Sequence, residues 1–152
     1  MTEWRNAVAN ALDDFVVVAA LAGNQLNDDE LFVEYLEMPH PQPKRLPPGK
    51  MAVYGFWGVG EWLKIGKAGP KSNARYTSQH YHPGRSKSNL SDSLVRDPRM
   101  AIVDGFDKQN PGQWVTQRTH RVNILISKQK HKTLLTRLEV FLQARLKPRY
   151  EG

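Results

Sequence analysis

Apolar residues recur at helical spacing near both ends of the chain. Across residues 4–19 they follow one another every three or four positions, and Gly23 stands where a helix C-cap belongs. The same spacing returns across residues 130–146 and stops before Pro148. We therefore expect an amphipathic helix in each of these two segments.

Short apolar runs rich in β-forming residues occupy the middle of the chain. Residues 51–57 and 62–66 are separated by a Gly-Val-Gly-Glu segment, which predicts a β-hairpin. Residues 118–127 alternate at first and end in an apolar run, which is typical of a third strand. Short helices are expected at 74–81 and 89–97. The pattern thus predicts an α+β fold with a small three-stranded antiparallel sheet flanked by helices.

Prolines set the N-terminal part of the chain apart from the rest. Residues 27–30 (NDDE) offer a cap and first-turn acids before the apolar segment LFVEYL, which predicts a short second helix over residues 31–36. Five prolines between residues 39 and 48 then oppose regular backbone hydrogen bonding. We expect a helical extension at 1–38, a proline-rich connector at 39–49 and the main domain at 50–152.

Charge is distributed unevenly along the 152 residues. The net charge is +7 and the sequence pI is near 9.8. Residues 1–47 hold eight acidic and three basic residues, whereas the remainder holds seven acidic and 19 basic ones. A basic body with interleaved aromatic residues is typical of a polyanion binder, so DNA is the expected partner. The acidic N-terminal helices are the expected surface for a protein partner.

The absence of cysteine excludes disulfides and thiolate-bound zinc. His80-Tyr81-His82 has no nearby second pair of ligands, so structural zinc is not expected there. The apolar run after Asp13 and Asp14 is too short for a membrane span and lacks the positive flank of a signal peptide. A cytoplasmic protein without membrane association is therefore expected.

Several short motifs of the basic part occur in a characteristic order. They are Ala52-Val53-Tyr54, Lys64-Ile65-Gly66, Arg75, Glu139 and the closing LKPRYEG. This pattern resembles the GIY-YIG nuclease superfamily over about residues 50–152, in the order and spacing that the family uses. Lys64 stands where the family usually has a second tyrosine, and Glu151 stands where an asparagine often follows the closing turn. The lysine is similar to that of some restriction-endonuclease members.

The resemblance implies a metal-dependent endonuclease that hydrolyses DNA phosphodiester bonds, related to restriction or phage defence. Tyr54 is then the expected general base, and Lys64 is expected to lower the pKa of its phenol from an ordinary value of about 10. Arg75 offers fixed donors for the charge of the transition state. Glu139 is expected to anchor one divalent ion, Mg²⁺ or Mn²⁺. His80 is the candidate for a catalytic helper.

Other interpretations of the same residues stay open. Lys67, Lys71, Arg85 and Lys87 are expected to contact backbone phosphates. Each catalytic candidate taken alone has a structural interpretation, such as packing for a tyrosine or an edge-strand position for a lysine. A protein that binds nucleic acid without cutting, or a protein-interaction module, is therefore an alternative. Cleavage of both DNA strands would need either a homodimer or two successive nicks.

Overall fold

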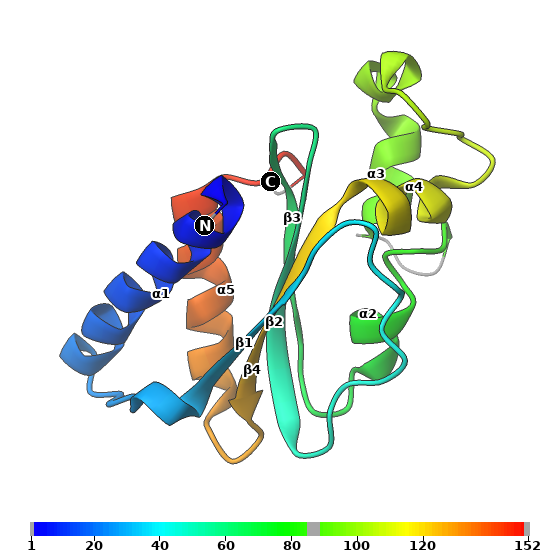
Figure 1. Ribbon diagram of the computed structural model, residues 1–152. Helices are drawn as coiled ribbons and strands as arrows, with labels where there is room; N and C mark the ends of the chain where they lie inside the picture. Colours follow the sequence, from blue (N-terminus) through cyan, green and yellow to red (C-terminus); the bar gives the residue numbers. More distant parts are fainter. Residues whose placement is uncertain (1, 85–88, 151–152) are drawn as a thin grey trace.

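The computed structural model of the chain describes residues 2–84 and 89–150 and has an α+β fold (Figure 1). Four strands form one antiparallel sheet in the spatial order β1-β4-β2-β3. Their bounds are β1 (Leu31–Leu36), β2 (Lys50–Gly58), β3 (Glu61–Ala68) and β4 (His120–Ser127). The sheet separates two layers of helices.

Helices cover both faces of the sheet (Figure 1). The first face carries α1 (Glu3–Leu21) and α5 (Lys132–Leu146), which confirms the two amphipathic helices predicted from the apolar spacing. The second face carries α2 (Asn73–Thr77), α3 (Leu90–Arg96) and α4 (Pro111–Arg118). Short 3-10 turns occur at Asp28–Glu30 and Pro98–Ile102. Of these helices, α4 was not predicted, although Pro111 provides a favourable first helical residue.

The predicted hairpin is confirmed by the pairing of β2 with β3. Its turn residues Val59 and Gly60 have φ angles of 48° and 79°, as a two-residue hairpin turn requires. The register places Tyr54 opposite Gly66, and an irregularity after Phe56 marks a bulge near the turn. The hairpin thereby brings the two sequence motifs side by side.

The predicted second helix is wrong, because residues 31–36 form strand β1. The start signal is real, since Asn27 and Glu30 make a capping box, but the helix they begin is a single 3-10 turn. The segment that follows pairs along β4, with Leu31 opposite Ile126 and Leu36 opposite Arg121. Pairing satisfies the backbone groups of β4 that would otherwise lie at an open edge. The sheet consequently has four strands, one more than predicted.

The N-terminal part shares its hydrophobic core with the rest of the chain. Trp4 of α1 is 2 % exposed and stacks on His120 at the start of β4, with ring centroids 4.6 Å apart. Arg145 of α5 forms an ion pair of 2.7 Å with Asp14 of α1. The shared core includes Val8, Leu12, Phe15, Val53, Ile65, Ile124, Leu138 and Leu142.

The proline-rich connector packs along the second face of the sheet. The His40 N–H donates to the carbonyl of Thr116 at 2.8 Å, and the Leu46 N–H donates to the Asn73 side chain at 2.7 Å. These bonds replace the regular ladder that prolines cannot provide. In the part of the chain that the structure describes, no helix combines the length and the apolar character needed to cross a membrane.

Candidate active site

The Tyr54 ring packs over Gly66, and its phenol oxygen contacts the His80 ring. Its oxygen is 2.6 Å from Nε2 of His80. A Cβ atom at residue 66 would lie 2.8 Å from the same oxygen, so the close approach requires glycine. Tyr54 is 0 % exposed, which places its phenol entirely beneath neighbouring side chains. The structure therefore joins Tyr54 of the first motif to Gly66 of the second.

The hydrogen bonds of His80 fix the position of its ring proton. The backbone N–H of Leu90 donates to Nδ1 at 3.0 Å, so Nδ1 carries no proton. Burial lowers the pKa of His80 well below its usual value, and the positive charges of Arg75, Arg121 and Lys64 lower it further. The neutral ring therefore carries its proton on Nε2 and donates it to the Tyr54 oxygen.

Lys64 shares the face of the sheet on which Tyr54 lies. The register puts Lys64 directly opposite Phe56, two residues from Tyr54 along β2, and this confirms the predicted shared face. Lys64 is 2 % exposed, and its charge acts on His80. The lysine is thus buried on the same face of the sheet as the phenol, as its predicted role requires. That role itself stays a prediction.

Arg75 lies on α2, the short helix beside β3 (Figure 1). It is partly exposed, and its charge is the second cause, after burial, of the low pKa of His80. A partly exposed guanidinium next to the buried Tyr54–His80 pair can meet an anion that arrives from solvent. Arg75 therefore combines partial exposure to solvent with an electrostatic effect on the buried His80.

Glu139 approaches β3 from the α5 side of the sheet, the face opposite to Tyr54. Its Oε1 accepts a hydrogen bond from Lys67 Nζ at 3.2 Å, and the carboxylate side chain is 16 % exposed. One turn further along α5, Gln143 donates to the carbonyl of Ile65 at 3.2 Å. Tyr54 and Glu139 therefore reach β3 from opposite faces, at the neighbouring residues Gly66 and Lys67.

Glu139 offers one carboxylate oxygen as a ligand for a divalent ion. Within residues 2–84 and 89–150, no three His, Asp or Glu side chains gather in a metal-binding cluster. Oε2 of Glu139 has no hydrogen-bond partner among these described residues, which leaves one carboxylate oxygen for an ion. Mg²⁺ is commonly bound by one or two carboxylates together with water and phosphate oxygens. The structure thus offers one protein ligand, and a phosphate would supply others.

The predicted phosphate-contacting residues have different surroundings. Lys67 pairs with Glu139, and Arg85 and Lys87 lie outside the described residues. Lys71 lines a hollow of 440 Å³ together with Lys50 and Lys128, which belong to segments far apart in the sequence. The lining also includes Pro47, Pro48, Gly49 and Asn73 and contains no carboxylate. We refer to this feature, defined by Lys50, Lys71 and Lys128, as the lysine hollow.

Three polar residues of the site were missed in the sequence. Arg121 and Asn123 lie on β4, are 0 % exposed and face Tyr54, while Glu34 on β1 accepts a hydrogen bond of 2.8 Å from the Asn123 amide. Arg121 and Asn123 are two residues apart within a buried strand, and this spacing is a signal for a polar pair on one face. Glu34 was not predicted as a site residue because residues 31–36 were expected to form a helix.

The C-terminal segment binds the edge of β3. The N–H groups of Arg149 and Tyr150 donate to the carbonyls of Trp62 and Leu63, at 2.9 and 3.0 Å. The Tyr150 hydroxyl donates to Asp97 at 2.7 Å, and burial raises the pKa of Tyr150 to about 12. The predicted difference at Glu151 lies outside the described residues.

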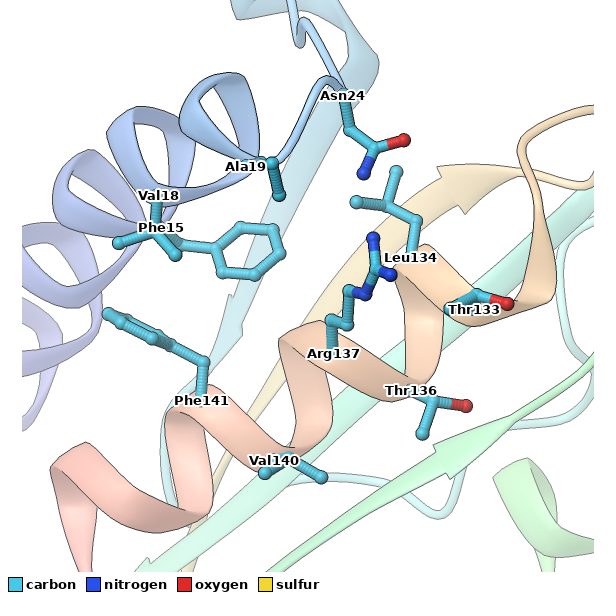
Figure 2. Close-up of a pocket in the computed structure, with 11 residues that line it drawn as sticks. Phe15, Val18, Ala19, Asn24, Thr133, Leu134, Thr136, Arg137, Val140 and Phe141 are labelled. Atoms are coloured by element: carbon cyan, nitrogen blue, oxygen red, sulfur yellow. The ribbon is translucent and has the colours of Figure 1, made fainter.

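An apolar hollow of 390 Å³ lies between α1 and α5, on the face away from Tyr54 (Figure 2). Figure 2 shows Phe15 and Phe141 at one end and Arg137 beside Leu134. Its described lining residues include no carboxylate, histidine or tyrosine, so they offer no group for acid–base chemistry. The hollow is therefore separate from the candidate active site.

Comparison with models of protein families, with curated proteins and with solved structures gives no match for this chain.

Proposed function

We propose that this protein is a metal-dependent endonuclease that hydrolyses DNA phosphodiester bonds, with a site similar to that of the GIY-YIG nucleases. The observation that carries the proposal is the hydrogen bond from neutral His80 to the Tyr54 oxygen, in a buried site where three positively charged side chains act on His80. Hydrogen bonding to an anion and nearby positive charge both favour ionisation of a phenol. Tyr54 can thereby serve as a base near neutral pH.

In the proposed reaction, the Tyr54 phenolate takes a proton from the attacking water. His80 keeps its own proton on Nε2 and holds the phenol oxygen in place, because its other nitrogen is occupied by Leu90. Arg75 stabilises the charge that grows on the phosphate oxygens. Lys64 supplies a fixed buried positive charge that favours the phenolate.

Glu139 is the residue that would hold a divalent metal ion, with its free Oε2 as the ligand. Because Glu139 lies on the face of the sheet opposite to Tyr54, an ion held there would reach the same phosphate only across the edge strand β3, where it would screen the phosphate charge and stabilise the leaving 3′ oxygen. The Lys67 ammonium already neutralises part of the Glu139 charge, so metal binding depends on the substrate phosphate for its remaining ligands. We therefore expect tight metal binding only together with DNA.

The lysine hollow supports a nucleic acid as the substrate. Three lysines from separate segments surround it without a lining carboxylate. Asn73, which lines the hollow, is two residues from Arg75 on α2, so a strand whose phosphates occupy the hollow passes close to that arginine. Contacts of this kind are independent of base sequence. We propose restriction or phage defence as the setting in which this small nuclease acts.

A second function is favoured by the burial of the site. Tyr54 is 0 % exposed, and Lys67 occupies Oε1 of Glu139. Hydrolysis requires a water molecule at the Tyr54 oxygen, so the covering side chains must move when DNA binds. A protein in which they stay in place would bind nucleic acid through its lysines without cutting it. This non-cleaving binder is the alternative.

Plasmid cleavage distinguishes the two functions. Supercoiled DNA is incubated with the purified protein in Mg²⁺, Mn²⁺ or EDTA, beside the variants Tyr54→Phe and Glu139→Gln. We expect metal-dependent nicking or linearisation, reduced about 10²- to 10⁴-fold in Tyr54→Phe through loss of the base. Glu3→Gln, which changes an exposed glutamate of α1, is the matched control and should cut normally.

The variants are also tested for DNA binding by gel shift. Retained binding with lost cleavage in Tyr54→Phe and Glu139→Gln supports the nuclease. Binding without cleavage by the unaltered protein in every metal supports the non-cleaving binder instead. Full cleavage by Tyr54→Phe would remove Tyr54 from the mechanism.

A further inference from the structure

Arg121 is a fully buried cation enclosed by aromatic rings. It is 0 % exposed, and its guanidinium carbon lies 4.9 Å from the ring centroid of Tyr54 and 4.7 Å from that of Tyr76. The rings of Phe56 and Tyr81 lie 5.1 and 5.9 Å away. Electron-rich ring faces attract a cation at these distances. Four aromatic side chains therefore replace the water around this charge.

The hydrogen bonds of Arg121 go to neutral groups. Nε donates to the Asn123 side-chain oxygen at 2.7 Å, and Nη1 donates to the Tyr81 hydroxyl at 3.0 Å. Nη2 donates to the backbone carbonyl of Tyr76 at 2.8 Å. Burying a charge costs free energy that hydrogen bonds to neutral groups repay only in part. The positive field of Arg121 therefore acts strongly on its surroundings, and the Tyr54 ring is part of them.

One carboxylate, that of Glu34, is linked to Arg121 through a single amide. Asn123 accepts from Arg121 with its oxygen and donates to Oε1 of Glu34 with its nitrogen, at 2.8 Å. Glu34, Asn123, Tyr54 and Gly66 are consecutive partners across the four strands, so they form one row of the sheet. A negative charge at one end of the row thus faces the phenol at its centre.

We propose that Arg121 is the positioning residue of the Tyr54 site, and that Glu34, acting through Asn123, moderates its effect on the phenol. The inference deepens the proposed function, since it assigns the source of the field that makes Tyr54 a base. Arg121 holds the ring by its face and favours the phenolate by its charge. Glu34 partly offsets that charge, so removing the Glu34 charge strengthens the field.

The other tyrosines make Tyr54 separable in a titration. Burial raises the pKa of Tyr35, Tyr76 and Tyr81, and burial together with Asp97 raises that of Tyr150 to about 12. These four tyrosines are therefore expected to ionise only above the ordinary phenol pKa of about 10. Protein labelled with ¹³C at the tyrosine Cζ reports each phenol separately, and the Tyr54 signal is assigned by its absence in Tyr54→Phe.

The experiment follows the Tyr54 titration by NMR in the unaltered protein and in three variants, without DNA or metal. We expect Arg121→Met to raise the midpoint by at least about one pH unit, and Arg121→Lys to restore part of the shift. Glu34→Gln keeps an oxygen for the Asn123 amide and should lower the midpoint. Arg118→Met, which removes a half-exposed guanidinium that pairs with Asp104, should leave it unchanged.

The proposal is overturned if the midpoint of the Tyr54 titration is unchanged in Arg121→Met. It is also overturned if that midpoint is unchanged or higher in Glu34→Gln. If Arg121→Met does not fold, the proposal is tested by Glu34→Gln alone. This variant replaces a partly exposed side chain by an isosteric one and should therefore fold. The titration needs no cleavage, so the expected shifts in a protein that cuts no DNA would reject the nuclease and keep the role of Arg121. Cleavage by a protein without these shifts would support the nuclease and reject the role of Arg121.

Discussion

His80 donates a hydrogen bond to Tyr54 and cannot accept one from it through the same nitrogen. The 2.6 Å contact joins Nε2 to the phenol oxygen, and the Leu90 N–H occupies Nδ1. Proton transfer from Tyr54 to His80 would therefore require the histidine to become doubly protonated. Burial and the nearby cations oppose that state. The phenol proton must leave by another route, and His80 remains to stabilise the anion.

Replacing Lys64 by methionine tests the charge beside the phenol. Lys64→Met keeps a long side chain at a 2 % exposed position but removes its charge. We expect the alkaline rise of the pH–rate profile to move upward by about one unit, because the phenolate loses a neighbouring cation. Cleavage rates between pH 6 and 10 provide the measurement. An unchanged profile at normal activity would exclude Lys64 from the mechanism.

The space between Gly66 and Tyr54 permits a matched pair of glycine substitutions. Gly66→Ala places a methyl group 2.8 Å from the Tyr54 oxygen, so the phenol must leave His80. We expect a loss of about 1–3 kcal/mol in unfolding free energy and loss of cleavage. Gly69→Ala meets no atom closer than Ser72 Oγ at 3.9 Å and should change neither. Equal effects of the two substitutions in urea unfolding and cleavage would contradict this account.

The lysine hollow is tested by the salt dependence of DNA binding. Lys50→Gln, Lys71→Gln and Lys128→Gln should each weaken binding and reduce the slope of log K against log salt by about one. Lys108→Gln, an exposed lysine before α4, serves as the control with an unchanged slope. Binding is measured with Tyr54→Phe protein, so that cleavage does not interfere. If the slope of log K against log salt is the same in the three hollow variants as in Lys108→Gln, phosphates do not bind in the hollow.

His40 predicts a loss of stability in mild acid. Burial is the main cause that lowers its pKa to about 4, although Nδ1 donates to the Thr119 carbonyl. Between about pH 6.5 and 4, the His40 ring is therefore protonated in the unfolded chain but neutral in the folded protein. The free energy of unfolding consequently falls as the pH drops through this range. The His40 contribution lost by pH 5 is about 2 kcal/mol.

The measurement is urea unfolding at pH 7.5 and pH 5. His40→Asn keeps a donor for the Thr119 carbonyl but cannot titrate, so its loss between the two pH values should be smaller than that of the unaltered protein. His82→Asn changes an exposed histidine and should behave like the unaltered protein. Parallel losses in all three proteins would show that His40 does not titrate on unfolding.

The hairpin and the amphipathic helices could be predicted because local chemistry determines them. The turn needs positive φ angles that Gly60 adopts freely, and the apolar spacing of α1 and α5 matches the burial of one face. The shared face of Tyr54 and Lys64 followed from the alternation of strand residues. These features depend on neighbours close in sequence.

The fourth strand and the polar row could not be predicted in the same way. Leu31–Leu36 carries a real helix start signal, and only its pairing with β4, about 90 residues later, decides in favour of a strand. The contact of Arg121 with Tyr76 and Tyr81 likewise joins residues at least 40 positions apart. Such contacts become visible only when the strand order is known.

The row that runs from Glu34 through Asn123 and Tyr54 to Gly66 also makes the site a test of correct folding. Each of its three links belongs to a different strand pair. A slip of one residue in any pair would turn one member to the opposite face and leave the Arg121 charge or the Tyr54 oxygen without its partner. A chain with a misaligned sheet therefore lacks the site altogether, so an active molecule is necessarily one whose four strands are all in register.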